Sequence, residues 1–269
     1  MQDQFKNKII LVTGGTQGLG AATAKLLAER GAEGLVICGR NREKGEAQSR
    51  ELDTLGARSL YVPADLSKVE DCQNLIAEAD RAFGRIDSLV NVAGMTNRGT
   101  ILDTSPDLFD QLFAVNTRAP FFLMQEAIRL FRRDAIAGTI VNISSMSSMG
   151  GQPFLAAYSA SKGALDTLTR NTAYAVLRNR IRINSLNIGW MASEGEDNTQ
   201  RLLDGQPDDW LVSAAARQPN GRLIEPEEVA RAIAFLASAE SGLMTGSIVN
   251  FDQGLWGAYD SVPQPETAL

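Results

Sequence analysis

The sequence predicts an α/β fold in which a doubly wound, seven-stranded, mostly parallel sheet carries helices on both faces. Short apolar runs alternate along the chain with longer segments of helical period, which is the pattern of successive β-α-β units. Several of these runs are nearly continuous valine, isoleucine and leucine, as expected for parallel strands buried on both faces. No repeat of solenoid period and no long linker interrupts the chain, so residues 1–269 are expected to form one domain.

The alternation places seven strands and six long helices. The strands are expected at residues 8–13, 35–39, 58–62, 86–92, 138–144, 181–187 and 247–251. The helices are expected at residues 18–30, 42–55, 68–83, 106–133, 154–177 and 226–237. Gly84 directly follows the third helix, where glycine suits a helix C-terminus. Pro226, followed by Glu227 and Glu228, suits a first helical turn, because proline is tolerated there and acids favour the helix dipole.

Residues 189–222 break the alternation between the sixth strand and the last helix. The segment is polar but contains Trp190 and Trp210. It emerges at the carboxyl end of a strand, where open α/β sheets bind their ligands, so it is expected to be a substrate loop. The tail after Trp256 is expected to be a loop that is either loose or docked on a neighbouring subunit.

Composition excludes several classes of function. The chain is 44% hydrophobic, which is enough for one large core, and its formal net charge of -6 does not attract nucleic acid or an anionic membrane. No stretch approaches the roughly 18 apolar residues of a transmembrane helix, and the N-terminus has no apolar signal region, so a cytoplasmic protein is expected.

Cys38 and Cys72, the only cysteines, imply no disulfide framework. The absence of histidine removes His-dependent catalysis and disfavours zinc, so no metal is expected.

A glycine-rich turn between the first strand and the first helix predicts a dinucleotide site of the Rossmann type. Glycines allow a tight turn and let main-chain N–H groups approach a pyrophosphate at the helix N-terminus. The spacing Gly14…Gly18-x-Gly20 is looser than G-x-G-x-x-G, so the turn alone is a weak indication. The residues expected to contact the cofactor here are Gly14, Thr16, Gln17, Gly18, Leu19 and Gly20.

The end of the second strand favours NADP(H) over NAD(H). A carboxylate at this position would bind the ribose of NAD, but Gly39 stands there and Arg40 follows it. Arginine at this position can pair with the 2′-phosphate of NADP(H). The alternative is that Arg40 is a solvated loop charge and that the protein prefers NAD(H). Asp65, which follows the third strand and precedes Leu66, is expected to cap the next helix or to bond the adenine.

Tyr158 and Lys162 form the candidate acid–base pair. Because they are four residues apart on a helix they share one face, and the ammonium is expected to lower the pKa of the phenol from about 10. Tyrosine would then act as an acid or base near neutral pH in a chain without histidine. Ser145 ends a strand, where its hydroxyl can donate to a carbonyl oxygen on which charge develops. A Tyr-x-x-x-Lys spacing alone is also typical of an exposed helix face, so only the combination with Ser145 and the glycine-rich turn indicates catalysis.

In these motifs the chain resembles a short-chain dehydrogenase/reductase of the single-domain branch of about 250 residues. The similarity extends over residues 8–254, and the matching motifs are Thr13-Gly14-x-x-x-Gly18-x-Gly20, Asn91-Val92-Ala93-Gly94, Asn116, Ser145, Tyr158-x-x-x-Lys162 and residues 184–189. The resemblance implies that Tyr158 donates or accepts the proton and that Ser145 orients the substrate oxygen. It implies that Lys162 holds the nicotinamide ribose and tunes Tyr158, and that Asn116 supports a water in the proton relay. Further cofactor contacts are implied at Asn91, Ala93, Gly94, Gly189 and Ser193.

Pro120 provides a separate reason for the role of Asn116. Proline cannot donate a hydrogen bond to the carbonyl four residues earlier, and its ring pushes that carbonyl aside. The main-chain oxygen of Asn116 is therefore expected to be free to bind water.

The chain departs from the family pattern outside the serine, tyrosine and lysine. Val92 replaces the second residue of the usual Asn-Asn-Ala-Gly, Ile188 replaces a proline before Gly189, and Gln253 stands in the late Asp-Gly-Gly. Ser193 replaces a threonine but keeps the hydroxyl. The lost proline weakens the expectation for the loop that carries the nicotinamide carboxamide contact.

The expected substrate pocket mixes polar groups with aromatic faces. Its lining is drawn from the insertion and from Met95, Thr96, Arg98, Met146, Ser147, Gln152, Phe154 and Trp190. A sugar or polyol, with an anionic group near Arg98, fits this lining better than a long acyl chain or a steroid. The alternative is that these residues are loop packing or solvated surface.

The sequence therefore predicts an NAD(P)-dependent oxidoreductase that interconverts a secondary alcohol and a carbonyl, with NADP(H) preferred. The alternatives are a catalytically silent nucleotide-binding sensor or scaffold, and a dehydratase or epimerase that recycles its cofactor. The apolar-faced helices 106–133 and 154–177 resemble the pair that forms the family's tetramer interface, so a homotetramer or homodimer is expected. These faces are alternatively covered by the protein's own loops.

Overall fold

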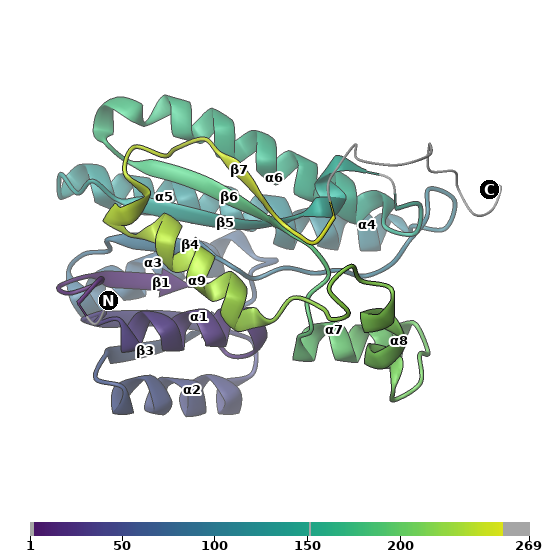
Figure 1. Cartoon of the computed structure of the whole chain (residues 1–269). Helices are drawn as coiled ribbons and strands as arrows, with labels where there is room; N and C mark the ends of the chain where they lie inside the picture. Colours follow the sequence, from purple (N-terminus) through teal and green to yellow (C-terminus); the bar gives the residue numbers. More distant parts are fainter. Residues whose placement is uncertain (1–2, 151, 255–269) are drawn as a thin grey trace.

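Seven parallel strands form the centre of the protein. The computed structural model describes residues 3–150 and 152–254. The strands are β1 (Ile9–Val12), β2 (Gly34–Gly39), β3 (Arg58–Pro63), β4 (Ser88–Asn91), β5 (Thr139–Ser145), β6 (Arg182–Ile188) and β7 (Ile248–Phe251). They lie in the order β3-β2-β1-β4-β5-β6-β7 and every pairing is parallel (Figure 1). The predicted seven-stranded α/β fold is confirmed, and its sheet is wholly parallel.

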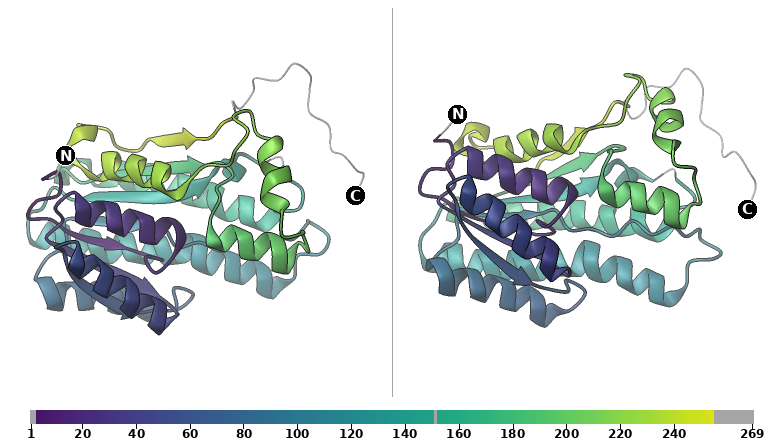
Figure 2. Two further views of the ribbon diagram at one scale, coloured as in Figure 1. Left: turned by 60° about the horizontal axis from the view of Figure 1, so that its bottom comes forward. Right: turned by 90° about the horizontal axis from the view of Figure 1, so that it is seen from below.

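Helices cover both faces of this sheet. They are α1 (Gly18–Glu29), α2 (Arg42–Thr54), α3 (Val69–Phe83), α4 (Pro106–Phe113), α5 (Ala119–Arg133), α6 (Ala156–Ala175), α7 (Glu194–Asn198), α8 (Trp210–Ala216) and α9 (Pro226–Ala237). α1, α2 and α9 lie on one face, whereas α3, α5 and α6 lie on the other (Figures 1 and 2). The strand order reverses between β1 and β4, and open α/β sheets bind ligands beyond the carboxyl ends of the strands at such a point.

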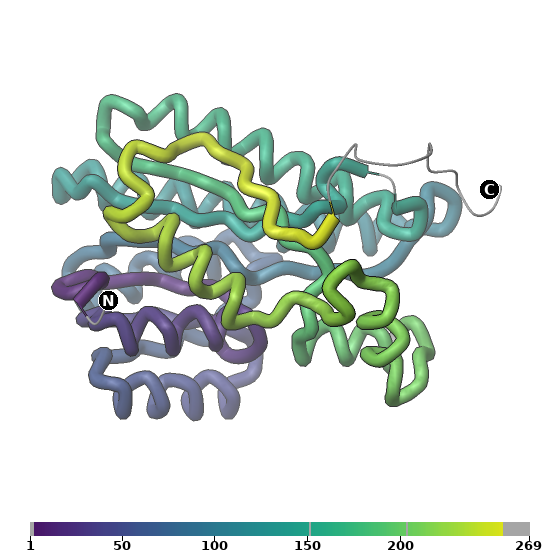
Figure 3. Tube along the Cα trace, viewed as in Figure 1, coloured from purple at the N-terminus to yellow at the C-terminus, as the bar shows by residue number. Residues whose placement is uncertain are grey.

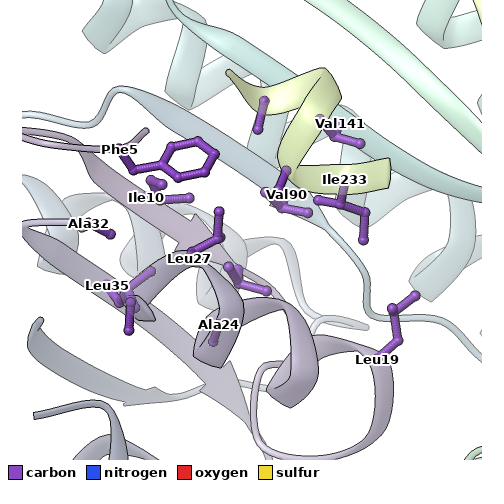
Figure 4. Packing of buried hydrophobic residues seen from close by; sticks show 14 of the residues in the cluster. Phe5, Ile10, Leu19, Ala24, Leu27, Ala32, Leu35, Val90, Val141 and Ile233 are labelled. Carbon is purple, nitrogen blue, oxygen red and sulfur yellow. The ribbon is translucent and has the colours of Figure 1, made fainter. Parts of the chain in front are cut away.

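Two hydrophobic clusters join the sheet to its two helix layers. Figure 4 shows the first, in which Phe5, Leu27 and Ile233 pack with strand residues such as Val90. In the second cluster Phe131 of α5 packs against α3 and the opposite face of the same strands. Strand β1 is buried along its whole length, which explains why its sequence is an uninterrupted apolar run instead of an alternating one.

The predicted helix ends are found at both positions that carried a specific signal. Gly84 is the C-cap of α3 and has a left-handed backbone, with φ of 74°. Pro226 begins α9, and Glu225 and Glu228 form a capping box there. Each device satisfies main-chain groups that the helix end would otherwise leave without partners.

The prediction of one α-helix over 106–133 is wrong. α4 ends at Phe113, a π-helical turn spans Ala114–Arg118, and α5 continues from Ala119. Pro120 accounts for the break, since it removes the N–H that an α-helix would offer to the carbonyl of Asn116. The occupancy of that carbonyl by water stays a prediction. The helix predicted at 154–177 begins only at Ala156, after a β-bridge between Gly99 and Leu155.

The insertion at 189–222 contains helices that the sequence did not predict. α7 runs into a π-helical turn over Thr199–Leu203, and α8 follows. The tube in Figure 3 shows this segment beyond one end of the sheet, to which the strands point their carboxyl ends. The tail after Trp256 lies outside the described residues.

Two further properties bear on the expected class of protein. Along the described ranges, no helix has both the length and the apolar character required to cross a membrane. Cys38 and Cys72 are buried and free, as expected from their number and spacing. Burial raises the pKa of these thiols to about 12 and about 11, so neither is a reactive thiolate near neutral pH.

Candidate active site

The glycine-rich turn has the backbone geometry of a phosphate cradle. Gly14 and Gly18 have positive φ values of 64° and 51°, a region that residues with a Cβ rarely adopt. A Cβ on Gly20 would lie 2.1 Å from the main-chain oxygen of Gly14, so only glycine permits this close approach. The turn leads directly into α1, whose first N–H groups need acceptors. These residues fit the pyrophosphate of a dinucleotide.

Thr13 joins this turn to the loop after β4. Its side-chain oxygen accepts hydrogen bonds from the N–H groups of Val92 (3.0 Å) and Ala93 (3.1 Å). Gly14 packs against Ala93, where a Cβ on the glycine would be 3.1 Å from Cα of Ala93. Two segments expected to contact the cofactor therefore lie side by side although they are far apart in the sequence.

The end of β2 is shaped for a residue without a side chain. A Cβ on Gly39 would approach the hydroxyl oxygen of Thr16 to 2.7 Å, so a carboxylate at this position would displace Thr16. Arg40 is exposed, and no ion pair connects it to the rest of the described chain. Lys44, which the sequence reasoning missed, contacts Gln17 Oε1 (3.2 Å) and Glu194 Oε1 (2.5 Å).

Asp65 and Asn91 are held by neighbouring polar groups. Asp65 accepts hydrogen bonds from Ser67 N (3.1 Å) and Ser67 Oγ (2.8 Å), and these bonds hold the pKa of its carboxyl below the usual range. It stabilises the turn before α3, whose N-cap is Lys68, so the expected helix-capping role is wrong in detail. Asn91 Nδ2 donates to Asn142 Oδ1 at 2.9 Å inside the sheet. Leu66 is half-buried against the second hydrophobic cluster.

The four predicted catalytic residues meet at the carboxyl ends of β4 and β5. Ser145 is the last residue of β5, Tyr158 and Lys162 lie on α6, and Asn116 lies in the π-helical turn. Lys162 Nζ is 5.9 Å from the centroid of the Tyr158 ring and donates to the main-chain oxygen of Ile143 at 2.8 Å.

Asn116 connects the loop after β4 to α6. Its Oδ1 accepts from Met95 N at 2.9 Å, and its Nδ2 donates to Met95 O (2.9 Å) and to Ser161 Oγ (3.0 Å). Ser161 Oγ in turn donates to the main-chain oxygen of Tyr158 at 2.7 Å. A Cβ on Gly94 would lie 3.4 Å from Lys162 Nζ and 3.6 Å from Asn116 Oδ1, so the loop passes directly over these side chains.

The electrostatics of Tyr158 differ from the expectation. Burial raises the pKa of its phenol; hydrogen bonding to Ser145 opposes this shift, the charge of Glu196 adds to it, and Arg98 opposes it. The prediction that a neighbouring lysine lowers the pKa of Tyr158 is therefore wrong for this structure. Burial also lowers the pKa of Lys162 to about 8, against a smaller opposing effect of Asp166. Helical spacing identified the pair, but it could not reveal that both groups are desolvated.

The loops expected to hold the nicotinamide end lie near the glycine-rich turn. Ser193 is the N-cap of α7, where its Oγ accepts from Glu196 N at 3.2 Å. A Cβ on Gly18 would lie 3.8 Å from Cβ of Ser193. A Cβ on Gly189 would lie 1.8 Å from Asp252 Oδ1, so any larger residue here would have to displace the Asp252 side chain.

The expected substrate residues lie partly beside Ser145 and Tyr158 and partly in the insertion. Ser147 N donates to Ser145 Oγ at 3.1 Å, and Ser147 Oγ donates to Gln152 Oε1. Met95 packs in the hydrophobic cluster that contains Tyr158. Trp190 belongs to the insertion, where its ring stacks on Trp210 with centroids 6.0 Å apart.

Arg98 is not a free anion site, which corrects the expectation. Its Nε and one terminal nitrogen lie 3.2 and 3.0 Å from Asp204 Oδ2, and the same terminal nitrogen lies 3.5 Å from Glu196 Oε1. The guanidinium also stacks at 5.9 Å over the ring of Phe154. Two carboxylates of the insertion, neither of which the sequence reasoning identified, thus balance its charge.

The glycine-rich turn, the parallel sheet and the grouping of a serine, a tyrosine and a lysine are together typical of a nicotinamide-dependent oxidoreductase. Residues 14–256 match the family described as enoyl-(acyl carrier protein) reductase. A solved structure described as a short chain dehydrogenase/reductase family protein superposes with a TM-score of 0.81 at 33% identity, covering 93% of this chain and 98% of that one. The chain belongs to the short-chain dehydrogenase/reductase family and is an oxidoreductase.

Characterised relatives act on different alcohols. The chain is 34% identical to cis-4-hydroxycyclohexanecarboxylate dehydrogenase of Sinomonas cyclohexanicum, over 94% of this chain and 98% of the relative. It is 32% identical to L-rhamnose 1-dehydrogenase (NAD(P)(+)) of Sphingomonas sp., over 94% and 97%. The family uses a nicotinamide cofactor and a small-molecule substrate.

Proposed function

We propose that this enzyme interconverts a secondary alcohol and a carbonyl, with Tyr158 as the acid–base residue. The observation that carries the proposal is the convergence of Ser145, Tyr158, Lys162 and Asn116 beside a cradle that admits only glycine. The nicotinamide, when bound, gives or takes the hydride. The silent sensor or scaffold receives no support, because the related proteins are dehydrogenases and reductases.

The protein's own groups then handle the proton. The raised pKa keeps the Tyr158 phenol protonated near neutral pH, so it is suited to donate to a substrate carbonyl. Ser145 stabilises the oxygen on which charge develops. Lys162 and a water on the main-chain oxygen of Asn116 would pass the proton on from the tyrosine. Orientation of the reactants against these fixed groups supplies a large part of the rate gain.

A substitution of Tyr158 tests this assignment. Tyr158→Phe should abolish turnover of alcohols and ketones, followed by the near-ultraviolet absorbance of reduced nicotinamide, while calorimetry shows nearly unchanged cofactor affinity. Tyr174→Phe is a matched control, since Tyr174 lies on the same helix but is 80% exposed. Full activity of Tyr158→Phe would refute the role, and equal loss in both variants would indicate damage to α6 instead.

NADP(H) is the proposed cofactor, with NAD(H) as the alternative. Three features support the preference: Gly39 offers no carboxylate to a ribose, Thr16 occupies the space beside it, and the exposed Arg40 follows. A guanidinium can bind a 2′-phosphate through two parallel hydrogen bonds. The cofactor is proposed to contact the glycine-rich turn, Arg40 and the loops after β3, β4 and β6.

A homo-oligomer, either a tetramer or a dimer, is proposed to form through α4, α5 and α6. A groove of about 910 Å³ runs along these helices. Phe121, a large apolar side chain that lines the groove, is 42% exposed, and Phe109 on α4 is 44% exposed. Phe121→Glu should lower the mass measured by light scattering, whereas Phe235→Glu on α9, which is also 42% exposed, should not. A monomeric wild-type protein would contradict this proposal.

A further inference from the structure

The insertion brings one carboxylate, Glu196, toward the proposed catalytic tyrosine. The three acids of α7 diverge: Glu194 pairs with Lys44, and Asp197 accepts from Trp210 Nε1 at 2.8 Å. Glu196 contacts neither of these partners, and its side chain is only 15% exposed. Trp190, which donates to Glu196, closely follows Ile188, the residue of β6 that pairs with Ser145, so Glu196 lies beyond the carboxyl ends of β5 and β6. Its negative charge also raises the pKa of Tyr158.

The hydrogen bonds of Glu196 are concentrated on one oxygen. Trp190 Nε1 and Gln200 Nε2 both donate to Oε1 at 2.8 Å, and Arg98 approaches the same oxygen at 3.5 Å. Among the residues that the structure describes, none donates to Oε2. A carboxylate oxygen has two lone pairs and is a strong acceptor, so Oε2 is available for a donor on a bound molecule.

The hydrogen-bonding chemistry of this oxygen disfavours an anionic ligand. The guanidinium of Arg98 is already paired with both Glu196 and Asp204. A second guanidinium, that of Arg217, lies 5.6 Å from the centroid of the Trp190 ring, so the charges here are balanced. A carboxylate or phosphate on the substrate could not donate a hydrogen bond to Oε2.

Gln152 offers the complementary group. Its Oε1 accepts from Ser147, which itself contacts Ser145, and within the described ranges its Nε2 donates to no other residue. Among the described residues, Glu196 thus offers an acceptor and Gln152 a donor that no other residue uses. Hydroxyls can serve either kind of group because they donate and accept, whereas an ammonium only donates and a carboxylate only accepts.

We infer that Glu196 determines substrate specificity by accepting a hydrogen bond from a second hydroxyl of the substrate, so that the substrate is a neutral diol or polyol. This inference rests on the proposed alcohol–carbonyl function and narrows it. Phe154, which is 49% exposed, lies beside the charged groups and offers apolar surface to the C–H face of a polyhydroxylated ring. The anionic group that the sequence placed near Arg98 is replaced by an uncharged one.

The test compares the full-length enzyme on three ring alcohols with saturating NADP⁺ or NAD⁺: cis-1,2-cyclohexanediol, cyclohexanol and cis-4-hydroxycyclohexanecarboxylate. Wild-type kcat/KM should be about tenfold or more higher for the diol than for cyclohexanol, because a hydrogen bond to a charged group gives that range. Glu196→Gln should lower this diol-to-monool ratio by a similar factor and should raise the relative rate on the carboxylate. Thermal unfolding and cofactor titration verify that the variant is folded.

Glu194→Gln is the matched control, since it removes the same charge from the same helix on the side that faces Lys44. Its diol-to-monool ratio should equal that of the wild type. A wild-type ratio near one, an unchanged ratio in Glu196→Gln, or an equal fall in Glu194→Gln would overturn the inference while turnover of cyclohexanol leaves the proposed function standing. Absence of turnover with all three alcohols and their ketones would overturn the proposed function and the inference together.

Discussion

Replacing Lys162 with methionine should stabilise the protein near neutral pH while removing its activity. The lysine is 3% exposed, and burial lowers the pKa of its ammonium to about 8. Methionine has a similar length and no charge, so it should fit the same space. Comparing this variant with the wild type measures how much a buried, desolvated ammonium lowers the free energy of unfolding.

The expected magnitude follows from the pKa. A shift from 10.5 to about 8 corresponds to about 3 kcal/mol, at about 1.4 kcal/mol per pH unit. Loss of the hydrogen bond to Ile143 O removes about 1 kcal/mol of stabilisation, which leaves a net gain of about 2 kcal/mol. The attraction between Lys162 and Asp166 is already contained in the shifted pKa, so it needs no separate correction.

The pH dependence has a defined sign. Because the folded-state pKa is depressed, the unfolded chain binds more protons than the folded protein between about pH 8 and 10.5, and the wild type gains stability as pH rises through this window. Below pH 8 the ammonium is charged in both states and the full penalty applies. The free-energy difference between Lys162→Met and wild type should therefore be largest at pH 7 and should shrink toward pH 10.

Urea unfolding of both proteins at pH 7, 8, 9 and 10 measures this difference. The buried thiols, whose pKa values are raised, also change stability above pH 9, but they do so equally in both proteins and cancel. Lys25→Met is the control, since Lys25 is 41% exposed and its variant should parallel the wild type. Parallel curves for Lys162→Met and wild type would refute the desolvation argument, as would a variant less stable than wild type at pH 7.

Three further substitutions test separate parts of the site. Gly20→Ala should destabilise the protein by about 1–3 kcal/mol and weaken cofactor binding, because its Cβ would meet Gly14 O at 2.1 Å; an unchanged melting temperature and an unchanged cofactor Kd would contradict this. Arg40→Ser should raise the Kd for NADPH about tenfold or more and leave that for NADH unchanged, and equal changes for both would exclude a phosphate contact. Glu196→Gln should lower the pKa of Tyr158 and move the pH dependence of alcohol oxidation to lower pH, so an unmoved profile would show that this charge does not act on the tyrosine.

The fold could be predicted because its signals are local. Strands β1 and β2 are buried on both faces and are therefore largely apolar runs, and Gly84 and Pro226 mark helix ends through their own backbone preferences. The break in the α-helix at Ala114–Arg118 was not predicted, although Pro120 indicates it. The proline was interpreted only as freeing one carbonyl, and the apolar period continues across the break.

The site could be predicted only as far as its motifs reach. The glycine-rich turn and the Tyr158–Lys162 spacing are each encoded within a few residues. Arg98 and Asp204 are 106 positions apart, and Lys44 and Glu194 are 150 apart, so no local pattern could connect them. The sequence also carries no measure of desolvation, which reverses the expected direction of the tyrosine pKa.

That reversal changes which group should lose its proton first. In the spacing argument the lysine stays charged and the phenol titrates near neutral pH, whereas in the structure the pKa of Lys162 falls to about 8 and that of Tyr158 rises above its ordinary value. As pH increases, Lys162 is therefore deprotonated while Tyr158 remains a neutral acid. The two protons belong to neighbouring groups, so a loss of carbonyl reduction near pH 8 would report on the lysine and not on the tyrosine. Of the two roles proposed for Lys162, these pKa directions favour holding and orienting its neighbours, through bonds such as the one to Ile143 O, over lowering the pKa of the phenol.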